Sequence, residues 1–447
     1  MRGLLDRRRA VLGAVFLAGY AWSTFAPGSF GTAVFLGTGA VLFAISVPWA
    51  SSFHKAFAGV AFVALAAAVA LGKFEAGVFL QDMPTYFGIV AVLLVLSIAG
   101  YPIRAARYEA QIRALVATLV RRGVGINATS GGLGHVLGAV LDVGAFVLID
   151  VIAGRAAPKR RLDALRWAGR AFSFAPLWTN LNVFTATTIV LTGVAYPSLL
   201  AATVPFIVLG LAGTVLAAQR EEGEVLTVSE APLDRGAAAV LLYPVLLVAA
   251  VALVNFLFPG LTLTGAIAIT VAVIVVLIAL LAAMMTRRRT PLGRLAEETR
   301  GSLVSSHSEF ALFGSAGVLV ISLQSTGALA PLGDLLSALP AVLVAPALTL
   351  IMAAGFLAGV HVIPMVLLLD AAFPLDAGPA PALWAVAILL GAQSTLLLTP
   401  FSSAVTMLSR LAGLHPIEVG PKRNWRFGLA VGLGALAYLG LLSALLL

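Results

Sequence analysis

Two short polar stretches that contain proline interrupt apolar segments of this chain. The first is Phe174-Ala-Pro-Leu-Trp-Thr-Asn-Leu-Asn182 and the second is Leu398-Thr-Pro-Phe-Ser-Ser403. Proline removes a backbone donor and interrupts a helix. An interrupted helix offers N–H groups at one end and carbonyls at the other, so it can bind an anion or a sodium ion without a charged side chain. The candidate binding residues are Pro176, Thr179, Asn180, Asn182, Thr399, Pro400, Ser402 and Ser403.

Ionisable side chains inside apolar segments form a second set of candidates, because a charge at membrane depth costs a few kcal/mol. Asp142 lies near the centre of its segment and could bind a cation or a proton. His361 could titrate near neutral pH, although a packing role is the simpler interpretation. The Ser, Thr and Asn candidates have a similar alternative, as hydrogen-bonding contacts between packed helices. His135, Asp150, Glu309 and Asp370 are also ionisable residues inside apolar segments.

The composition indicates that lipid surrounds most of this chain. Hydrophobic residues make up 61% and charged residues 11%, whereas about a quarter of the residues of a soluble domain are charged. The formal charge of +9 is concentrated in short clusters at the ends of apolar segments, where the positive-inside rule places Lys and Arg. No basic face interleaves with stacking aromatics, which argues against nucleic-acid binding.

Two further classes of site are disfavoured. Cysteine is absent, so disulfides and thiolate metal sites are excluded. No Walker loop, zinc-protease motif or serine nucleophile elbow is present, which argues against an ATP-driven pump or an intramembrane hydrolase. No cofactor is expected beyond a sodium ion or a proton.

The apolar segments predict an all-α integral membrane protein with about 11 transmembrane segments, because roughly 20 apolar residues span a bilayer. Basic residues mark cytoplasmic segment ends. The amino terminus, with Arg7 to Arg9 before the first apolar run, is therefore expected in the cytoplasm and the carboxyl terminus outside. The expected ordinary spans are residues 10–26, 30–49, 56–72, 85–101, 198–218, 237–258, 260–286, 303–326 and 427–447.

Two other apolar segments are expected to be re-entrant hairpins. Residues 124–154 have arginine clusters on both sides, so both of their ends are expected in the cytoplasm. Residues 340–371 have acidic flanks, which predict a hairpin that enters from the outside. Each hairpin is followed by a segment with a polar proline break, residues 171–197 and 380–410, which we expect to be a helix broken within the membrane.

This order of elements repeats in opposite orientation. The first repeat covers residues 1–218, a charged cytoplasmic linker covers residues 219–236, and the second repeat covers residues 237–447. Inverted repeats with broken helices place a substrate near the bilayer midplane, where the repeats meet.

This pattern resembles the ion transporter superfamily, a group of elevator-type secondary carriers that includes divalent-anion/sodium symporters. That family has short Ser-Asn-Thr-type motifs at hairpin tips, and Asn127-Ala-Thr-Ser130 resembles them in the first half. In the second half the resembling stretches are Gly391-Ala-Gln-Ser-Thr395 and Thr399-Pro-Phe-Ser-Ser403. The resemblance implies a homodimer that forms through scaffold spans, here residues 30–101 and 237–286. It adds five candidates for substrate or ion binding, Asn127, Thr129, Ser130, Ser394 and Thr395.

The predicted function is secondary active transport of a small anionic solute, a carboxylate or an oxyanion, driven by a sodium or proton gradient. The expected location is the plasma (inner) membrane. A cation/proton antiporter that uses Asp142 is one alternative. A membrane enzyme or a lipid-handling protein is an alternative of a different class.

Overall fold

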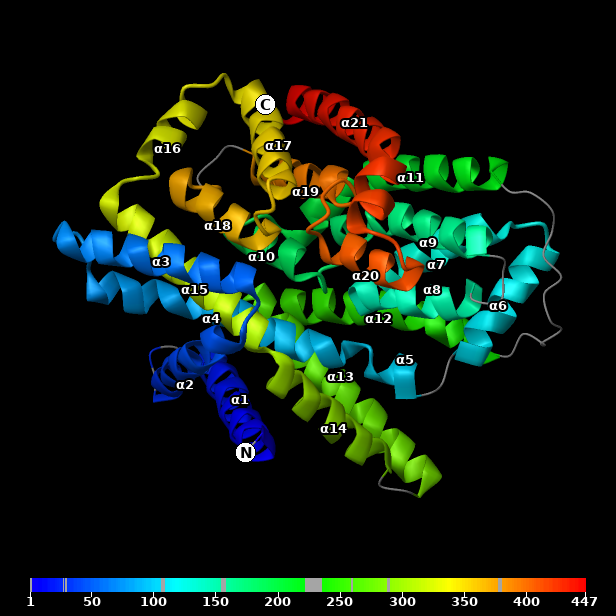
Figure 1. Cartoon of the computed structure of the whole chain (residues 1–447), viewed down its shortest axis with the longest axis horizontal. Helices are drawn as coiled ribbons and strands as arrows, with labels where there is room; N and C mark the ends of the chain where they lie inside the picture. The colour runs from blue at the N-terminus through cyan, green and yellow to red at the C-terminus, as the bar shows by residue number, and fades with distance from the viewer. Residues whose placement is uncertain are drawn as a thin grey trace. The chain divides into compact units, whose positions relative to one another are not determined.

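A computed structural model describes residues 2–26, 28, 30–105, 109–153, 158–221, 235–258, 260–287, 290–376 and 380–447. These residues are helical and contain no strand (Figure 1). They form two compact units, and each unit draws on both halves of the sequence. Unit 1 comprises Met1–Ala105, Ala250–Ser337 and Leu367–Pro374, and unit 2 comprises Ala106–Ala249, Ala338–Val366 and Leu375–Leu447. The division into two sequence repeats stays a prediction.

Unit 1 consists mainly of long helices. At its centre α15 packs against α3 and α4, and α1 packs against α2. The Phe16 ring lies 5.0 Å from the rings of Phe35 and of Phe310, measured between centroids, and so joins three helices. The helices of this unit are α1 (Arg2–Phe25), α2 (Phe30–Ser46), α3 (Ser52–Ala70), α4 (Ala76–Ala99), α5 (Tyr101–Ala105), α13 (Leu263–Thr286), α14 (Thr290–Ser305), α15 (His307–Thr326) and α16 (Ala330–Ser337).

Unit 2 contains shorter, interrupted helices, and the boundary between the units falls inside α12 (Arg235–Leu257) and α18 (Val362–Ala372). Its other helices are α6 (Glu109–Arg121), α7 (Ile126–Leu141), α8 (Ala145–Ala153), α9 (Pro158–Phe172), α10 (Val183–Thr192), α11 (Tyr196–Arg220), α17 (Ala341–Leu357), α19 (Pro381–Thr395), α20 (Ser403–Ala412) and α21 (Arg423–Leu446).

Two extensive helix pairs in unit 2, α7 with α9 and α17 with α19, depend on glycine. A Cβ atom on Gly134 would lie 2.7 Å from the Ala168 carbonyl oxygen, and one on Gly391 would lie 2.5 Å from the Thr349 carbonyl oxygen. Both distances are shorter than a real contact allows. The close approach of each pair therefore requires a residue without a side chain.

Eight helices among the described residues are long and apolar enough to cross a membrane. Large apolar side chains on several of them are exposed, for example Leu281 on α13 and Leu433 on α21, as expected for helices that face lipid. Shorter apolar helices include α10, α17, α18 and α19. The number of about 11 segments stays a prediction.

One expected boundary differs from the observed helices. The first broken segment was expected over residues 171–197, but its first helix, α9, begins at Pro158 and includes the basic residues. These residues are compatible with a helix because α9 is amphipathic, with Leu165, Trp167 and Ala168 buried on one side. Most of the predicted linker, residues 222–234, lies outside the described residues.

Candidate functional site

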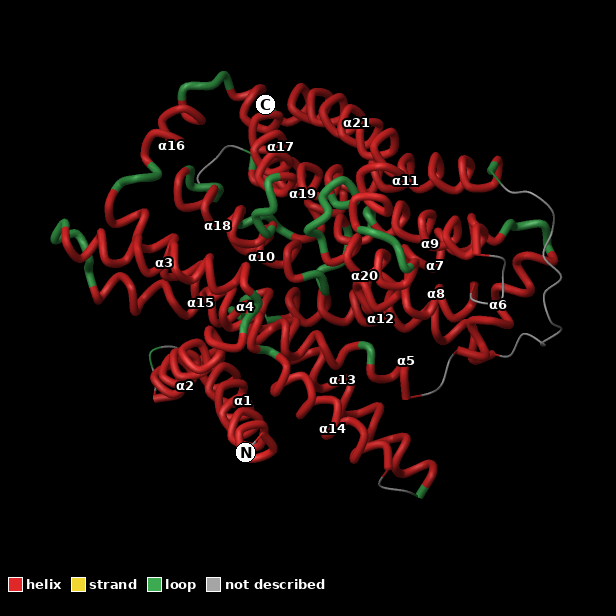
Figure 2. Tube along the Cα trace, in the orientation of Figure 1, coloured by secondary structure: helices red, strands yellow, loops and turns green. Residues whose placement is uncertain are grey.

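The two predicted breaks interrupt helices at matching positions in unit 2. The first separates α9 from α10, and the second separates α19 from α20; both are loops in Figure 2. Each break ends in a side chain that caps the next helix. The Asn182 side-chain oxygen accepts hydrogen bonds from the Phe184 and Thr185 N–H groups at 3.1 and 3.4 Å. The Ser402 hydroxyl accepts one from the Val405 N–H at 3.0 Å. Such caps fix where a helix restarts.

A buried threonine lies three residues before each cap. The Thr179 hydroxyl accepts a hydrogen bond from the Leu181 N–H at 3.2 Å, and the Thr399 hydroxyl accepts one from the Phe401 N–H at 3.3 Å. Both helices that follow have ten residues and end at a glycine in the left-handed conformation. The same polar turn and helix therefore occur twice.

The remaining break residues belong to the same turns. Pro176 lies in the short helical turn Ala175–Leu177, and its carbonyl accepts a hydrogen bond from the Thr185 hydroxyl. Pro400 precedes Phe401 in the second break, and Ser403 is the first residue of α20.

Each break lies beside the turn of a helix pair. α7 and α8 are joined through Asp142–Gly144, and the Thr179 hydroxyl donates to the Ala139 carbonyl, three residues before that turn, at 3.0 Å. α17 and α18 are joined through residues 358–361, where a Cβ on Gly359 would lie 3.1 Å from the Phe401 ring. The structure thus brings together residues that are distant in sequence.

The turn residues themselves have an unusual backbone. Gly359, the second residue after α17, has φ +91°, and Asp142, the residue directly after α7, has φ +50° with ψ −138°. Positive φ is uncommon for a residue with a side chain and costs about 1–3 kcal/mol. The Asp142 side chain is exposed. His361 is also exposed, and its Nδ1 accepts a hydrogen bond from the Ile363 N–H at 3.4 Å, so it helps to begin α18.

A series of hydrogen bonds connects the first break to α7, α9 and α11. The Trp178 indole N–H donates to Nε2 of the buried His135 at 3.0 Å, and Nδ1 of His135 lies 3.2 Å from the Ala171 carbonyl oxygen. Both contacts are hydrogen bonds when the proton is on Nδ1, which makes His135 neutral. The Tyr196 hydroxyl donates to the Trp178 carbonyl. His135 is among the residues predicted from the sequence and Trp178 is not, although a tryptophan inside a polar break is a signal.

Several buried oxygens next to the breaks have no hydrogen-bond partner within the described part of the chain. They are Oδ1 of Asn180, Oγ1 of Thr187 and Oε1 of Gln393. Asn180 uses only its amide nitrogen, which donates to the Val248 carbonyl at 3.5 Å. α19 contacts both α10 and the turn Ala175–Leu177. Unpaired buried acceptors are costly and suit a cation or a proton donor. Thr187 and Gln393 were not predicted as site residues.

Two of the polar motifs that resemble family motifs have different positions. Ser394 and Thr395 end α19 directly before the second break, and their hydroxyls donate to the Gly391 carbonyl at 2.9 and 3.1 Å. Asn127, Thr129 and Ser130 instead form the first turn of α7. That is the end of α7 away from Asp142, about 20 Å along the helix axis. The expected position at a hairpin tip is therefore wrong, because the chain already enters its helix at Gly125.

Comparison with known proteins found similarity to a solved structure and none to a family model or a curated sequence. A solved structure, that of the YdaH transporter of Alcanivorax borkumensis, described as having an unusual topology, superposes with a TM-score of 0.53 at 17% sequence identity. The match covers 88% of this chain and 97% of that chain.

This chain has the fold of a membrane transporter. Together with its apolar helices, that likeness makes it a multi-pass membrane protein. Membership of the ion transporter superfamily stays a prediction.

Proposed function

We propose that this protein is a secondary active transporter of a small anionic solute, a carboxylate or an oxyanion, coupled to a sodium or proton gradient. The observation that carries the proposal is the duplicated polar break, Thr179 to Asn182 and Thr399 to Ser402, within one compact unit. The likeness to a solved transporter supports it.

The breaks offer N–H donors, which an anion needs, and oxygen acceptors, which a cation needs. The Asn182 and Ser402 caps accept hydrogen bonds from some of the N–H groups that the first turns of α10 and α20 do not use themselves. The remaining N–H groups and the helix dipole favour an anion. No Lys or Arg occurs from Ala171 to Gln219 or from Gly301 to Ser409, so neutral groups would bind the solute. The unpaired oxygens of Asn180 and Gln393 are of the type that sodium prefers.

The proposed mechanism is an elevator movement. Unit 2 holds both helix-pair turns and both breaks, whereas unit 1 holds long spans, and such a division would let one unit carry the solute and the other stay fixed. In the proposed topology the two helix pairs are re-entrant hairpins of an inverted repeat. In this proposal the amino terminus is on the cytoplasmic side of a plasma (inner) membrane, and the protein is a homodimer through residues 30–101 and 237–286.

The test is the thermal stability of the purified protein against carboxylates and inorganic oxyanions, each with sodium, with potassium and at two pH values. A ligand at about 100 times its dissociation constant stabilises by roughly 2.7 kcal/mol. Stabilisation by an anion that requires sodium or low pH supports the proposal. If no anion shifts the unfolding temperature under any condition, anion transport is wrong.

The exposed carboxylate of Asp142, held in a costly backbone conformation, favours a second candidate, a cation/proton antiporter. In that case cations or pH alone shift the stability, and sodium added to protein-containing vesicles changes their internal pH. The Asp142→Asn variant would then lose this exchange.

A further inference from the structure

A cavity of about 490 Å³ lies in unit 2, between the start of α9 and the segment that joins α20 to α21. Its lining combines three cations, Lys159, Arg161 and Arg423, with one carboxylate, Asp163, and with leucines such as Leu162 and Leu414. None of these residues belongs to the breaks or the turns described above. The cavity is therefore a separate site.

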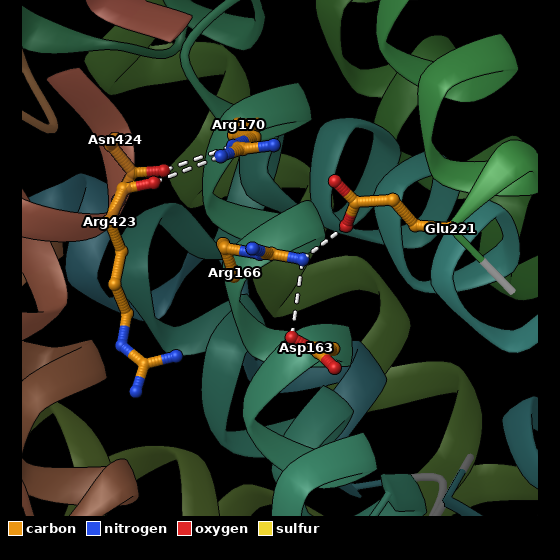
Figure 3. Close-up of polar contacts among 6 residues, drawn as sticks. All are labelled: Asp163, Arg166, Arg170, Glu221, Arg423 and Asn424. Atoms are coloured by element: carbon orange, nitrogen blue, oxygen red, sulfur yellow. Dashed lines mark hydrogen bonds and ion pairs between the residues drawn. The ribbon is translucent and has the colours of Figure 1, made fainter. Parts of the chain in front are cut away.

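Two of the four charged groups are already compensated by neighbours. Arg161 donates to both oxygens of Asp150, at 2.6 and 2.8 Å, and to the Leu411 carbonyl at 3.0 Å. These hydrogen bonds to the Asp150 carboxylate raise the pKa of the Arg161 guanidinium. Asp163 lies 3.2 Å from Arg166, which also contacts Glu221 (Figure 3). The carboxylate in the lining is therefore not a free repulsive charge.

The other two cations are not compensated. Neither Lys159 nor Arg423 has an ion-pair partner among the residues that the structure describes. Arg170 does bind Arg423, but it donates to the backbone carbonyl at 3.0 Å. The Arg423 guanidinium extends away from Arg170 in Figure 3. Two exposed cations at one cavity attract an anion.

The cavity lies at the end of a candidate membrane span. Arg423 is the first residue of α21, inside the candidate membrane span Glu418–Leu446. Trp425, two residues later, is 52% exposed, as is typical of tryptophan at the level of the headgroups. The basic flank of α9 also places this edge on the expected cytoplasmic side. A ligand with a phosphate and apolar chains matches both the cations and the leucines.

We propose that this cavity binds the headgroup phosphate of an anionic phospholipid. Lys159 and Arg423 supply the positive charges, and Leu162 and Leu414 contact the glycerol and the first acyl carbons. Because Lys159 belongs to α9 and Arg423 to α21, the bound lipid links the first interrupted helix to the last span of the same unit. Anionic lipid therefore stabilises unit 2 independently of any transported solute.

The experiment measures the unfolding temperature of the full-length protein in detergent micelles with added phosphatidylglycerol, phosphatidylcholine or inorganic phosphate. We expect phosphatidylglycerol to raise it more than phosphatidylcholine does, and inorganic phosphate to have no comparable effect. The double variant Lys159→Gln/Arg423→Gln should keep the unfolding temperature in phosphatidylcholine and lose the additional rise with phosphatidylglycerol.

The matched control is Lys422→Gln/Arg426→Gln, which removes two charges at the same end of α21 without altering the cavity lining. It should respond to phosphatidylglycerol as the unaltered protein does. Three results would overturn the proposal: an equal effect of phosphatidylcholine, the full effect from inorganic phosphate alone, or an equal loss in the control variant. None of these results bears on solute transport, which the anion panel tests separately.

Discussion

The two halves of unit 2 share a polar break beside a helix-pair turn, but the side chains at those turns differ. Asp142 occupies the first turn, where the second turn has Gly359. Leu181, two residues after Thr179, is 5% exposed, whereas Phe401, two residues after Thr399, is 68% exposed. The first turn thus carries a carboxylate and the second carries the imidazole of His361, and the second break also exposes an aromatic ring.

The largest expected effect is that of Asp142→Asn on cation-driven exchange. If the first turn supplies the titrating group, the sodium-driven pH change in vesicles should be at least about tenfold smaller in the variant, because an amide side chain binds no proton near neutral pH. Asp334→Asn, at an exposed carboxylate of unit 1, is the matched control and should keep full exchange. Unchanged exchange in Asp142→Asn would remove the chemical distinction between the halves.

The glycine contacts should be equally sensitive in both halves. Gly134→Val and Gly391→Val each place a side chain against a facing backbone at 2.5–2.7 Å, so each should destabilise the protein by about 3 kcal/mol. The measurement is the unfolding temperature in detergent. Gly132→Ala, on an open face of α7, should have little effect. A tolerated valine at only one of the two positions would show that the helix pairs are not equivalent.

The hydrogen-bonded chain of His135 and Trp178 belongs to the first half. Trp178→Phe keeps an aromatic side chain but leaves Nε2 of His135 without its donor, which should cost about 2 kcal/mol of stability. Adding His135→Leu should recover part of that loss, because the unpaired polar group is then removed. Trp425→Phe, at an exposed tryptophan, is the control. If the single variant were as stable as the unaltered protein, this hydrogen bond would not support the break.

The smallest effects are expected from the backbone of the turns, and they should have opposite signs. Asp142→Gly should raise the stability by about 1 kcal/mol, because glycine adopts positive φ without cost. Gly359→Ala should lower it by a similar amount. Chemical denaturation of both variants checks the signs. A loss of stability in Asp142→Gly would mean that the carboxylate makes a stabilising contact.

The interruptions of the two helices follow from local sequence. Pro176 and Pro400 lack a backbone donor, and the Asn182 and Ser402 side chains compete for backbone N–H groups, so both breaks were predictable. The start of α7 was not, because Asn127 to Ser130 suit a polar turn as well as a first helical turn. Gln393 was missed although it lies in the quoted Gly391-Ala-Gln-Ser-Thr395 motif, because only the packing of α19 leaves its side-chain oxygen buried without a partner.

By itself, the sequence determined the membrane class, the helical content and the places where helices break, because these depend on composition and on local backbone chemistry. Only the tertiary structure decided which segments are neighbours. Hydrogen bonds between residues distant in sequence join Thr179 to Ala139 and Trp178 to His135. Each compact unit is likewise built from segments of both halves of the sequence. The positive φ of Asp142 is of the same kind, since only the surrounding packing can hold an aspartate there.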